Sequence, residues 1–426
     1  MKYNIISFLG VFLTINTPSL GNGFLGPYNS FSNAGVGGAG ISGGSISDVY
    51  RNRTITDASS LNLNPALAAE VPNQGTFSAG PNYQNQRFDT SRSSINRVLT
   101  TQGGPVLPPH RHSLKNKNQF FPSSFGGFTH RINDRVVTGV AVTGFSWGGG
   151  GGFVRYKSNI ISPALPPISK SFNLAALTIP LTISFQPTPS QSYGFSMILG
   201  AAGLQTNLAK PTNPFVETSG HNHLRVVEGL GARIGGKWDL FSQLSAGATV
   251  STPVYFTKFD NYTDVLPHRL EIPMQIGGGL TWHALPTTDA LIDITGYFWK
   301  FSKITGKSPV HGGFGWRNTF DVRTGINHKI NETWTVRLGY QYSMTPVQKK
   351  FLFNQALSPS HVFIKNYITT GLKVDITPCL SLEGELAYGL KTKLRDPGAG
   401  LFNGFTRNIT MEASSLFSLV GFTWKY

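Results

Sequence analysis

The sequence predicts an all-β protein: a 14-stranded antiparallel transmembrane β-barrel, whose lumen needs a plug, such as an N-terminal hatch, or must leak. Three observations predict it: a composition low in charge, long segments of alternating hydrophobicity, and a regular exchange of short turns and long loops. Charged residues make up only 13% of the 426 residues, whereas 49 are glycine and 12% are aromatic. About 25% charge is usual in soluble domains, so this composition suits an outer surface that faces lipid.

A membrane protein of this composition must cross the bilayer with strands. After the first 15 residues no run of 18 apolar residues occurs, so no segment is a candidate transmembrane helix. Only helices and closed barrels satisfy every backbone hydrogen-bonding group in lipid. A closed barrel is therefore the remaining way to span.

The N-terminus indicates export. Lys2 precedes an apolar stretch from Ile5 to Ile15, and Pro18, Ser19 and Gly21 follow. This pattern is typical of a secretory signal cleaved near Gly21, although an uncleaved anchor stays open. The expected organisation is a signal peptide at 1–21, a hatch at 22–74 and a barrel at 75–426. The single Cys379 cannot form an internal disulfide.

The net charge of +16 does not indicate nucleic-acid binding. Lys and Arg are scattered singly through alternating segments, without an aromatic RNA-binding motif or a helix-turn-helix pattern. We expect instead a cationic surface that faces outer-membrane lipid and lipopolysaccharide headgroups, or one that attracts carboxylate ligands.

Alternation with period two begins near Thr76 and is clearest in three segments. In "LEIPMQIGGGLTW", Leu270, Ile272, Met274, Ile276, Leu280 and Trp282 are predicted to share one face. In "TWTVRLGYQYSM", Trp334, Val336, Leu338, Tyr340, Tyr342 and Met344 oppose Thr335, Arg337, Gly339, Gln341 and Ser343. In "VFIKNYITTGLKVDI", Ile364, Ile368, Leu372, Val374 and Ile376 oppose Lys365, Tyr367, Thr369 and Lys373. Strands this long favour a membrane barrel over a soluble sandwich, in which strands average nearer six residues.

Turns and loops give the number of strands. Short turns are predicted at Asn133-Asp134, 187–191, 240–243, 286–289, 331–333 and 377–379. Longer loops are predicted at about 90–121, 148–170, 210–223, 259–267, 303–313, 347–360 and 392–411. Six turns and seven loops separate fourteen strands, and short turns on one side with long loops on the other are usual in these barrels. The aromatic C-terminus is typical of a strand that closes a barrel, because it places Val420, Phe422, Trp424 and Tyr426 on one face. The alternative is any buried terminal strand.

The residues give little support for an enzyme or a metal site. His221 with His223, and His110 with His112, have a spacing that can bind a metal, but both pairs lie in predicted loops without nearby carboxylates. The run Gly148–Gly152 lacks the Lys-Ser/Thr of a phosphate-binding loop, and no G-x-S-x-G elbow occurs. We therefore expect no enzyme, metal or cofactor, while a Ser/His site like that of an outer-membrane phospholipase stays open.

The predicted inward face carries charges of both signs on several strands. Two interpretations stay open, a paired network that stabilises the barrel and contacts with a ligand; pairing is favoured because buried charges persist when paired. The residues are Arg233, Glu271, Asp293, Asp321, Arg323, Arg337, Lys365, Glu383 and Glu385.

Nearly the whole mature chain resembles one known family. "GVGGAGISGGSISD…DASSLNLNPALAA", "LEIPMQIGGGLTWHALPTTDALIDITGYFWKF" and "GWRNTFDVRTGINHKINETWTVRLGYQYSMTPV" are similar to segments of the FadL-type outer-membrane transporters of long-chain fatty acids and other hydrophobic compounds. That resemblance implies a fourteen-stranded barrel with an internal hatch, an apolar groove between the outer loops and a pocket within the barrel. It also implies ligand exit sideways through an inward kink in the third strand, without a cofactor or an energy source.

The resemblance assigns candidate residues. Asn64, Pro65 and Ala66 match the Asn-Pro-Ala of the family's hatch, which implies a gating role; the alternative is a plain turn set by proline. The third strand is Arg135 to Trp147, in which Gly144 beside Phe145 is the candidate kink, or simply a small wall residue. Arg317 in "GWRN" matches one basic position of the family's pocket, which implies that it binds a ligand carboxylate. The alternative is an ordinary arginine at the level of the aromatic girdle, without a ligand role. The other basic position aligns near Gln205, which weakens a carboxylate ligand.

The sequence thus predicts passive transport of hydrophobic small molecules, most simply long-chain fatty acids, across the bacterial outer membrane by a monomeric barrel. The alternatives are an uptake channel for aromatic or aliphatic hydrocarbons, a non-specific porin, an adhesin or phage-receptor barrel, and an outer-membrane lipase.

Overall fold

The computed structural model describes residues 30–43, 56–92, 113–115, 120–147, 154–158, 168–207, 209–210, 213–217, 219–355, 362–400 and 406–426. The long strands are β1 (Gln74–Asp89), β3 (Phe120–Arg131), β4 (Val136–Trp147), β6 (Ile168–Thr188), β7 (Gln191–Thr206), β10 (Arg225–Phe241), β11 (Leu244–Ser251), β14 (Gln275–Leu285), β15 (Thr288–Tyr297), β16 (Thr319–Lys329), β17 (Trp334–Ser343), β18 (Asn366–Thr377), β19 (Leu380–Arg395) and β20 (Thr410–Lys425).

Shorter elements lie in the long connections and in the N-terminal segment before β1. The short strands are β2 (Ser113–Lys115), β5 (Val154–Ser158), β8 (Ala209–Lys210), β9 (Asn213–Glu217), β12 (Val254–Phe256) and β13 (Glu271–Ile272). The helices are η1 (Ala34–Val36), η3 (Ala58–Asn62), η4 (Pro65–Ala69), η6 (Asp260–Tyr262), η7 (Trp299–Phe301), α3 (Lys303–Gly306), η8 (Pro309–His311) and η9 (Lys349–Gln355).

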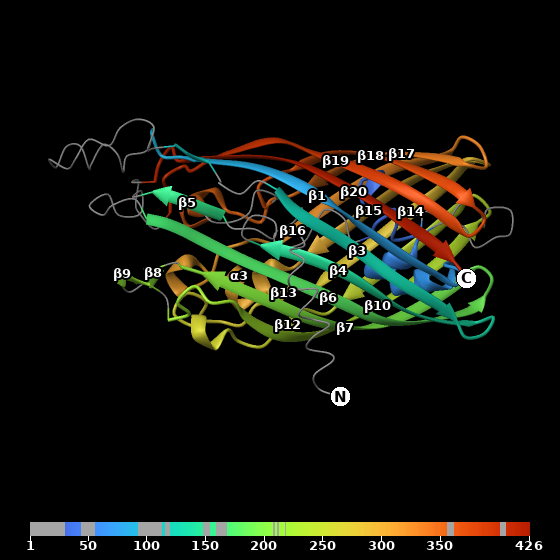
Figure 1. Cartoon of the computed structure of the whole chain (residues 1–426), viewed down its shortest axis with the longest axis horizontal. Coiled ribbons are helices and arrows are strands. Elements are labelled where there is room, and N and C mark those ends of the chain that lie inside the picture. Colours follow the sequence, from blue (N-terminus) through green and yellow to red (C-terminus); the bar gives the residue numbers. More distant parts are fainter. Residues whose placement is uncertain are drawn as a thin grey trace.

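The long strands form a closed antiparallel barrel of fourteen strands, as the turns and loops predict. Each pairs with its neighbours in chain order, and β1 closes the barrel by pairing with both β3 and β20. Figure 1 shows tight turns at one end, where the C-terminus lies, and longer connections at the other. We call these the short-turn end and the long-loop end. Closure gives every long strand a partner on both sides, the condition for a strand protein in lipid.

The predicted alternation is confirmed on most strands. On β17 the side chains of Trp334, Leu338 and Tyr340 are exposed on the outer wall, whereas Arg337 and Gln341 are buried inside. On the last strand, Val420, Phe422 and Trp424 face outward with Tyr426 beyond them. Period-two patterning therefore specifies which side chains meet lipid.

One predicted strand is wrong at its long-loop end. "LEIPMQIGGGLTW" does not run as a single strand with one apolar face, because Pro273, which has no N–H to donate, separates β13 from β14. Leu270 and Ile272 turn into the lumen and are buried, whereas Ile276 and Trp282 lie outside as predicted. Ile364 is likewise buried inside rather than outward, since β18 begins only at Asn366.

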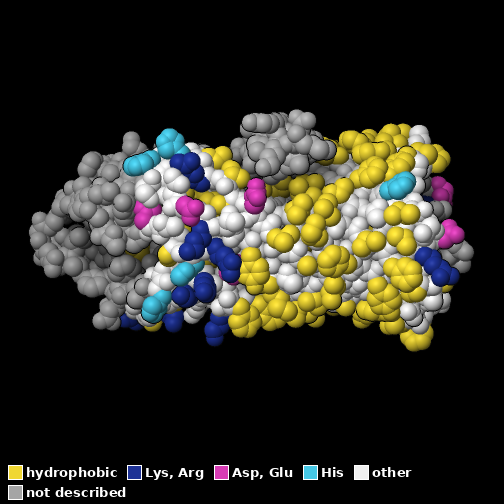
Figure 2. Space-filling model, turned by 90° about the horizontal axis from the view of Figure 1, so that it is seen from below, with side chains coloured by type: hydrophobic (Ala, Val, Ile, Leu, Met, Phe, Trp, Pro, Cys, Tyr) yellow, Lys and Arg dark blue, Asp and Glu magenta, His cyan; other side chains and the backbone are white. Residues whose placement is uncertain are grey.

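The outer wall is largely apolar. Figure 2 shows hydrophobic side chains spread over the barrel, with most Lys, Arg and His side chains toward the long-loop end and a few at the short-turn end. Among the exposed large hydrophobic residues on this wall are Ile183, Phe195, Leu230, Ile234 and Leu338. No helix within the described ranges is long and apolar enough to cross a bilayer.

The N-terminal residues 30–43 and 56–73, here called the inner segment, lie within the barrel near its short-turn end (Figure 1). η1 packs against β16 to β19, η3 against β3 and β4, and η4 against β6, β7 and β10. Room comes from inward-facing glycines, at which a Cβ would overlap the inner segment. They are Gly127, Gly139, Gly194, Gly235, Gly247, Gly277, Gly325, Gly339 and Gly421. β1 begins at Gln74, next to the boundary expected from the sequence.

Candidate functional site

The lumen is layered along its axis, and a single strand shows the order. From the long-loop end, the inward side chains of β10 include Val227, Arg233, Gly235 and Lys237. Val227 belongs to an apolar cluster, Arg233 lines a polar cavity, Gly235 makes room for the inner segment, and Lys237 joins a charged layer. The alternation of each strand thus places four kinds of surface at four depths.

The apolar cluster lies on the inner barrel wall and the inner loop faces at the long-loop end. Trp299 and Trp316 pack edge to face, with ring centroids 5.1 Å apart, and both are fully buried. Tyr262, in the loop between β12 and β13, is also buried and bonds to the carbonyl of His223 at 2.7 Å. Further members include Phe88, Ile198, Leu204, Phe256, Phe259, Tyr297, Leu352, Phe363 and Met411. This surface can hold an apolar molecule by the hydrophobic effect.

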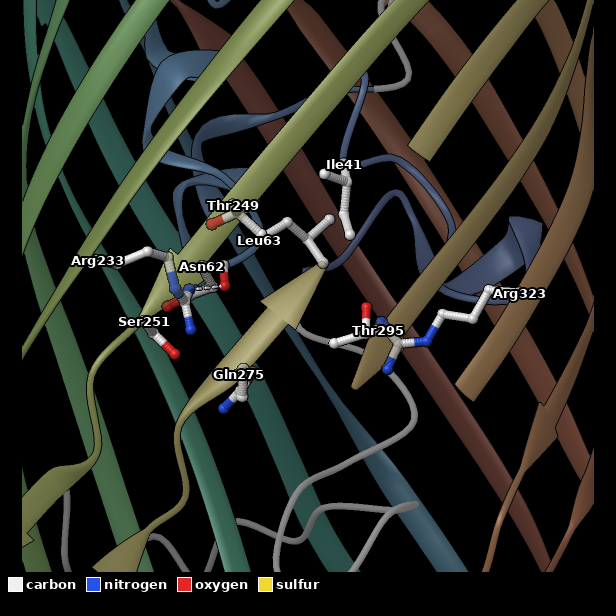
Figure 3. A pocket seen from close by; sticks show the side chains of 9 residues that line it. All are labelled: Ile41, Asn62, Leu63, Arg233, Thr249, Ser251, Gln275, Thr295 and Arg323. Atoms are coloured by element: carbon white, nitrogen blue, oxygen red, sulfur yellow. Dashed lines mark hydrogen bonds between the residues drawn. The ribbon is translucent and has the colours of Figure 1, made fainter. Parts of the chain in front are cut away.

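A polar cavity of about 10 Å³ lies on the short-turn side of the cluster. This volume is close to that needed for one water molecule. Figure 3 shows Arg233 and Arg323 at opposite sides of it, with Ser251, Gln275 and Thr295 between them and Asn62 next to Arg233. The Arg233 guanidinium donates a hydrogen bond to the carbonyl of Asn62. This hydrogen bond links the barrel wall to the inner segment beside the cavity.

The polar cavity has more donors than acceptors. The hydroxyls of Ser251 and Thr295 and the Nε of Arg323 are buried without a hydrogen-bond partner in the described part of the chain. One terminal nitrogen of Arg323 donates to Asp321 at 3.0 Å and to the Tyr297 hydroxyl at 2.9 Å. Arg233 forms no ion pair with any carboxylate that the structure describes. Unpartnered donors beside a cation favour an anionic oxygen atom.

The inner segment holds Asn64, Pro65 and Ala66 against the wall, fully buried. Asn64 begins η4: its side-chain oxygen accepts from the N–H of Ala66 at 3.0 Å, and Pro65 occupies the first helical position. Its amide nitrogen donates to the carbonyls of Ile41 at 2.9 Å and of Gly236, on β10, at 3.1 Å. Asn64 therefore ties two parts of the inner segment to the barrel.

Other wall residues bind backbone groups of the inner segment. Asp293 accepts from the N–H groups of Gly40 at 2.7 Å and Ile41 at 2.9 Å. Thr369 accepts from the N–H of Gly37 at 2.9 Å and donates to the carbonyl of Gly35 at 2.8 Å. These side chains supply hydrogen-bond partners that the short turns of the inner segment do not supply internally.

Ion pairs form the layer nearest the short-turn end. Arg337 lies 2.9 Å from Glu383 and 2.7 Å from Glu385, and Glu383 also accepts from Ser32 at 2.8 Å. Lys237 pairs with Glu70 of the inner segment and lies 3.3 Å from Asp239. For these residues the structure supports the paired network rather than ligand contact. Two residues that the sequence placed in that network bind backbone groups of the inner segment instead: Arg233 donates to the carbonyl of Asn62, and Asp293 accepts from Gly40 and Ile41.

Ser245, His283 and Asp289 have the order of a nucleophile, base and acid. The Ser245 hydroxyl is 3.1 Å from His283, whose other ring nitrogen is 2.7 Å from Asp289. All three are at most 2% exposed, and the Ser245 hydroxyl also lies 2.7 Å from Asp239. A hydroxyl held by a carboxylate in a closed layer has no position for a substrate. The three residues extend the polar network around the barrel.

The wall between the second and third strands is paired over only part of its length. The last pair toward the long-loop end joins Phe125 of β3 to Thr143 of β4. Beyond it, residues 120–124 pair with β1 alone and residues 144–147 with β6 alone. Pairing of β4 with β6 is also interrupted opposite Pro180, which has no N–H. The unpaired stretch begins at Gly144, the kink candidate; the side chains of Gly144 and Phe145 lie outside the described residues.

The two candidate ligand residues do not line the polar cavity. Arg317 is exposed, and its Nε donates to the carbonyl of Thr345 at 3.2 Å; its neighbour Trp316 enters the apolar cluster instead. Gln205, on β7, donates to the carbonyl of Asn222 at 3.0 Å. Of the loop histidines, His221 and His223 are exposed, while His110, His112, Gly148–Gly152 and residues 1–21 lie outside the described residues. No group of three metal-binding side chains occurs within the described ranges.

Sequence reasoning missed the polar cavity. Arg233, Ser251, Thr295 and Arg323 occupy inward positions on β10, β11, β15 and β16. The inward residues before Arg233 and Arg323 are Gly231 and Asp321, so no change from apolar to polar side chains marks this depth on those two strands. Only the register of the barrel brings the four residues together, and no local sequence signal could have found the cavity.

The fold is that of known hydrophobic-compound transporters. No protein-family model matches the chain, and no curated protein matches it. Among solved structures, a Pseudomonas aeruginosa FadL homologue is similar with a TM-score of 0.64 and 15% identity, over 95% of this chain and 99% of that one. The Pseudomonas putida toluene transporter TodX gives 0.64 and 15%, over 94% and 98%. The Ralstonia pickettii toluene transporter TbuX gives 0.60 and 13%, over 93% and 99%.

Proposed function

We propose that this barrel lets hydrophobic small molecules, long-chain fatty acids foremost, cross the bacterial outer membrane by passive diffusion. The barrel would sit with its apolar wall in lipid, its short turns in the periplasm and its long loops outside. The single observation that carries the cargo assignment is the apolar cluster that ends on a donor-rich cavity. That order matches a molecule with a long apolar tail and one anionic end.

The two surfaces would divide the binding free energy. Each buried CH₂ of an alkyl chain contributes about 0.8 kcal/mol, so several methylenes in the apolar cluster suffice for capture. A carboxylate beside Arg233 would form charge-assisted hydrogen bonds, each about 1.5–3 kcal/mol. The same oxygen could accept from Ser251 or Thr295, which are buried without partners in the described part of the chain.

Release would follow from competition at Arg233. Its guanidinium donates to the carbonyl of Asn62, two residues before Asn64. A carboxylate that takes over this donor frees the carbonyl and loosens the inner segment there. In this proposal the Asn-Pro-Ala turn acts as a gate component, and the ligand leaves sideways where β3 and β4 are unpaired beyond Thr143. Arg317 and Gln205 receive no ligand role.

Uptake of radiolabelled oleate tests the proposal. In cells whose only transporter is this chain, Arg233→Gln should reduce oleate uptake about tenfold, because it removes charge-assisted bonds worth about 1.5 kcal/mol or more. The matched control is Arg225→Gln, an exposed arginine on the same strand, which should leave uptake unchanged. Equal uptake in wild type and Arg233→Gln at equal surface level would contradict the carboxylate assignment.

A hydrocarbon channel is the second candidate. It is favoured by the aromatic character of the cluster, with Trp299, Trp316 and Tyr262, and by the fold shared with toluene transporters. Toluene has no anionic end, so its uptake should not depend on Arg233. Rapid toluene uptake with no oleate uptake would decide for the hydrocarbon.

Planar-bilayer recording separates both candidates from an open porin. A lumen occupied by the inner segment should conduct almost no ions. A stable conductance of an open pore would support the porin alternative. An adhesin would be indicated instead if loss of the loop at 90–121 abolished binding to a partner while oleate uptake continued.

A further inference from the structure

A basic patch lies on the outer wall of the barrel at its long-loop end, outside the lumen and its polar cavity. It is formed by β19, β20, β1 and β2, which lie side by side. Antiparallel register places Lys393, Glu412, Arg87 and Lys115 in one row across these four strands. The patch consists of Arg87, Arg92, Lys115, Lys391, Lys393 and Arg395.

A β-bulge puts three of these cations on the outer wall. The register between β19 and β20 shifts between Gly389 and Thr392, so that two residues face Ser414 alone. Before the bulge, Tyr388 faces outward; after it, Lys391, Lys393 and Arg395 are exposed while Thr392 and Leu394 are buried. Without the extra residue the alternation would direct the cations into the lumen. The bulge therefore selects a cationic exterior at this height.

The patch surrounds a groove of about 390 Å³. Six cations face two carboxylates, Asp89 and Glu412. Glu412 is shared by Lys391 at 2.8 Å and Lys393 at 2.9 Å, and those two lysine side chains stay 66% and 59% exposed. Arg395 is held by Asn408, which accepts from it at 3.0 and 2.6 Å. The groove thus offers excess positive charge together with uncharged polar groups from Ser91, Asn408 and Thr410.

The height of the patch matches a lipid headgroup layer. The nearest outward apolar row below it joins Tyr388, Leu416 and Tyr83. Leu416 lies four residues from Glu412, about 13 Å along the strand and about 10 Å along the membrane normal for a usual strand tilt. Lipid-facing side chains stop where the hydrocarbon ends, and the next layer carries headgroup phosphates.

We propose that the basic patch binds the phosphorylated sugar headgroup of lipopolysaccharide in the outer leaflet. The cations pair with its phosphates, and Ser91, Asn408 and Thr410 hydrogen-bond its sugar hydroxyls. The docked lipid shields the β1–β20 junction, at which the barrel closes. This rests on the outer-membrane orientation proposed above and is independent of the cargo.

The test is binding of lipid A to the full-length barrel in detergent, followed by native mass spectrometry. The variant Lys391→Gln/Lys393→Gln/Arg395→Gln should bind diphosphorylated lipid A about 100-fold more weakly, because each basic side chain near an anionic surface contributes roughly a factor of five. The control Lys258→Gln/Lys300→Gln/Lys303→Gln removes the same charge from exposed loops elsewhere and should bind as wild type.

Two further measurements make the result specific. Dephosphorylated lipid A should bind wild type and the patch variant equally weakly, and inorganic phosphate at the same phosphate concentration should not displace the lipid. Oleate binding should be unchanged in the patch variant, so this test and the cargo test fail separately. Equal affinity of the patch variant and wild type for diphosphorylated lipid A, with both heat-modifiable in gels as folded barrels are, would overturn the proposal. Equal loss in both triple variants would overturn it too.

Discussion

Replacing Asn64 by alanine should loosen the inner segment without unfolding the barrel. The side chain is fully buried and makes three hydrogen bonds: it accepts from Ala66 and donates to the carbonyls of Ile41 and Gly236. Alanine keeps the Cβ and removes all three. Because strand pairing does not involve this side chain, the barrel itself should stay intact.

The magnitude follows from these three bonds. Loss of an N-cap costs about 1 kcal/mol, and each lost hydrogen bond to a buried carbonyl costs about another 1 kcal/mol. The seated inner segment should thus lose about 3 kcal/mol. At 1.4 kcal/mol for each factor of ten, its displaced fraction should rise about 100-fold.

Planar-bilayer recording measures that fraction, since a displaced inner segment leaves a conducting lumen. Wild type should be nearly silent, and Asn64→Ala should show about 100-fold more frequent openings. The matched control is Asn331→Ala in the exposed β16–β17 turn, where the side chain accepts from Thr333 and Trp334 at 2.9 Å each. Asn331→Ala removes similar turn-stabilising hydrogen bonds outside the lumen, so this variant should conduct as little as wild type. An Asn64→Ala barrel as silent as wild type, with unchanged hydrogen exchange at residues 56–71, would refute the reasoning.

Three other substitutions probe the lumen. Pro65→Gly should leave the barrel folded but reduce oleate uptake, because glycine releases the fixed φ that starts η4; unchanged uptake at equal surface level would reduce the motif to a turn. Gly194→Val should displace the inner segment and raise conductance, because a side chain there overlaps Pro65. The control is Gly384→Val, which should not raise conductance, because a Cβ at Gly384 contacts nothing. Equal conductance of the two variants would contradict the close packing of the inner segment against Gly194. Arg337→Met should lower the unfolding free energy by about 3–5 kcal/mol, because Glu383 and Glu385 stay buried unpaired; in denaturant titrations, adding Glu383→Gln and Glu385→Gln should restore part of it.

The barrel could be predicted from local patterns because strand alternation and turn residues act over a few positions. Trp334 to Ser343 alternates without interruption, and the structure keeps every one of those faces. Pattern fails where the chain leaves the sheet. Leu270 and Ile272 continue the period of Ile276, but Pro273 ends the ladder and both turn inward.

The site was less predictable, because its content depends on partners distant in sequence. Arg233 and Arg337 both face inward on strands whose side chains alternate between the lumen and the outer wall. Only the register of the barrel brings Glu383 and Glu385 to Arg337, while Arg233 meets the carbonyl of Asn62 instead. The bulge after Gly389 is another long-range feature: the sequence shows two alternating phases there, and the register shift opposite Ser414 shows how they join.

The most direct test of the central claim is the position of a brominated long-chain fatty acid in crystals of the detergent-purified protein, located by anomalous scattering. The account predicts the carboxylate within hydrogen-bonding distance of Arg233 and the brominated tail in the apolar cluster between Trp299 and Phe256. A continuous water-filled pore through the lumen, or a fatty acid bound only on the outer wall, would contradict it.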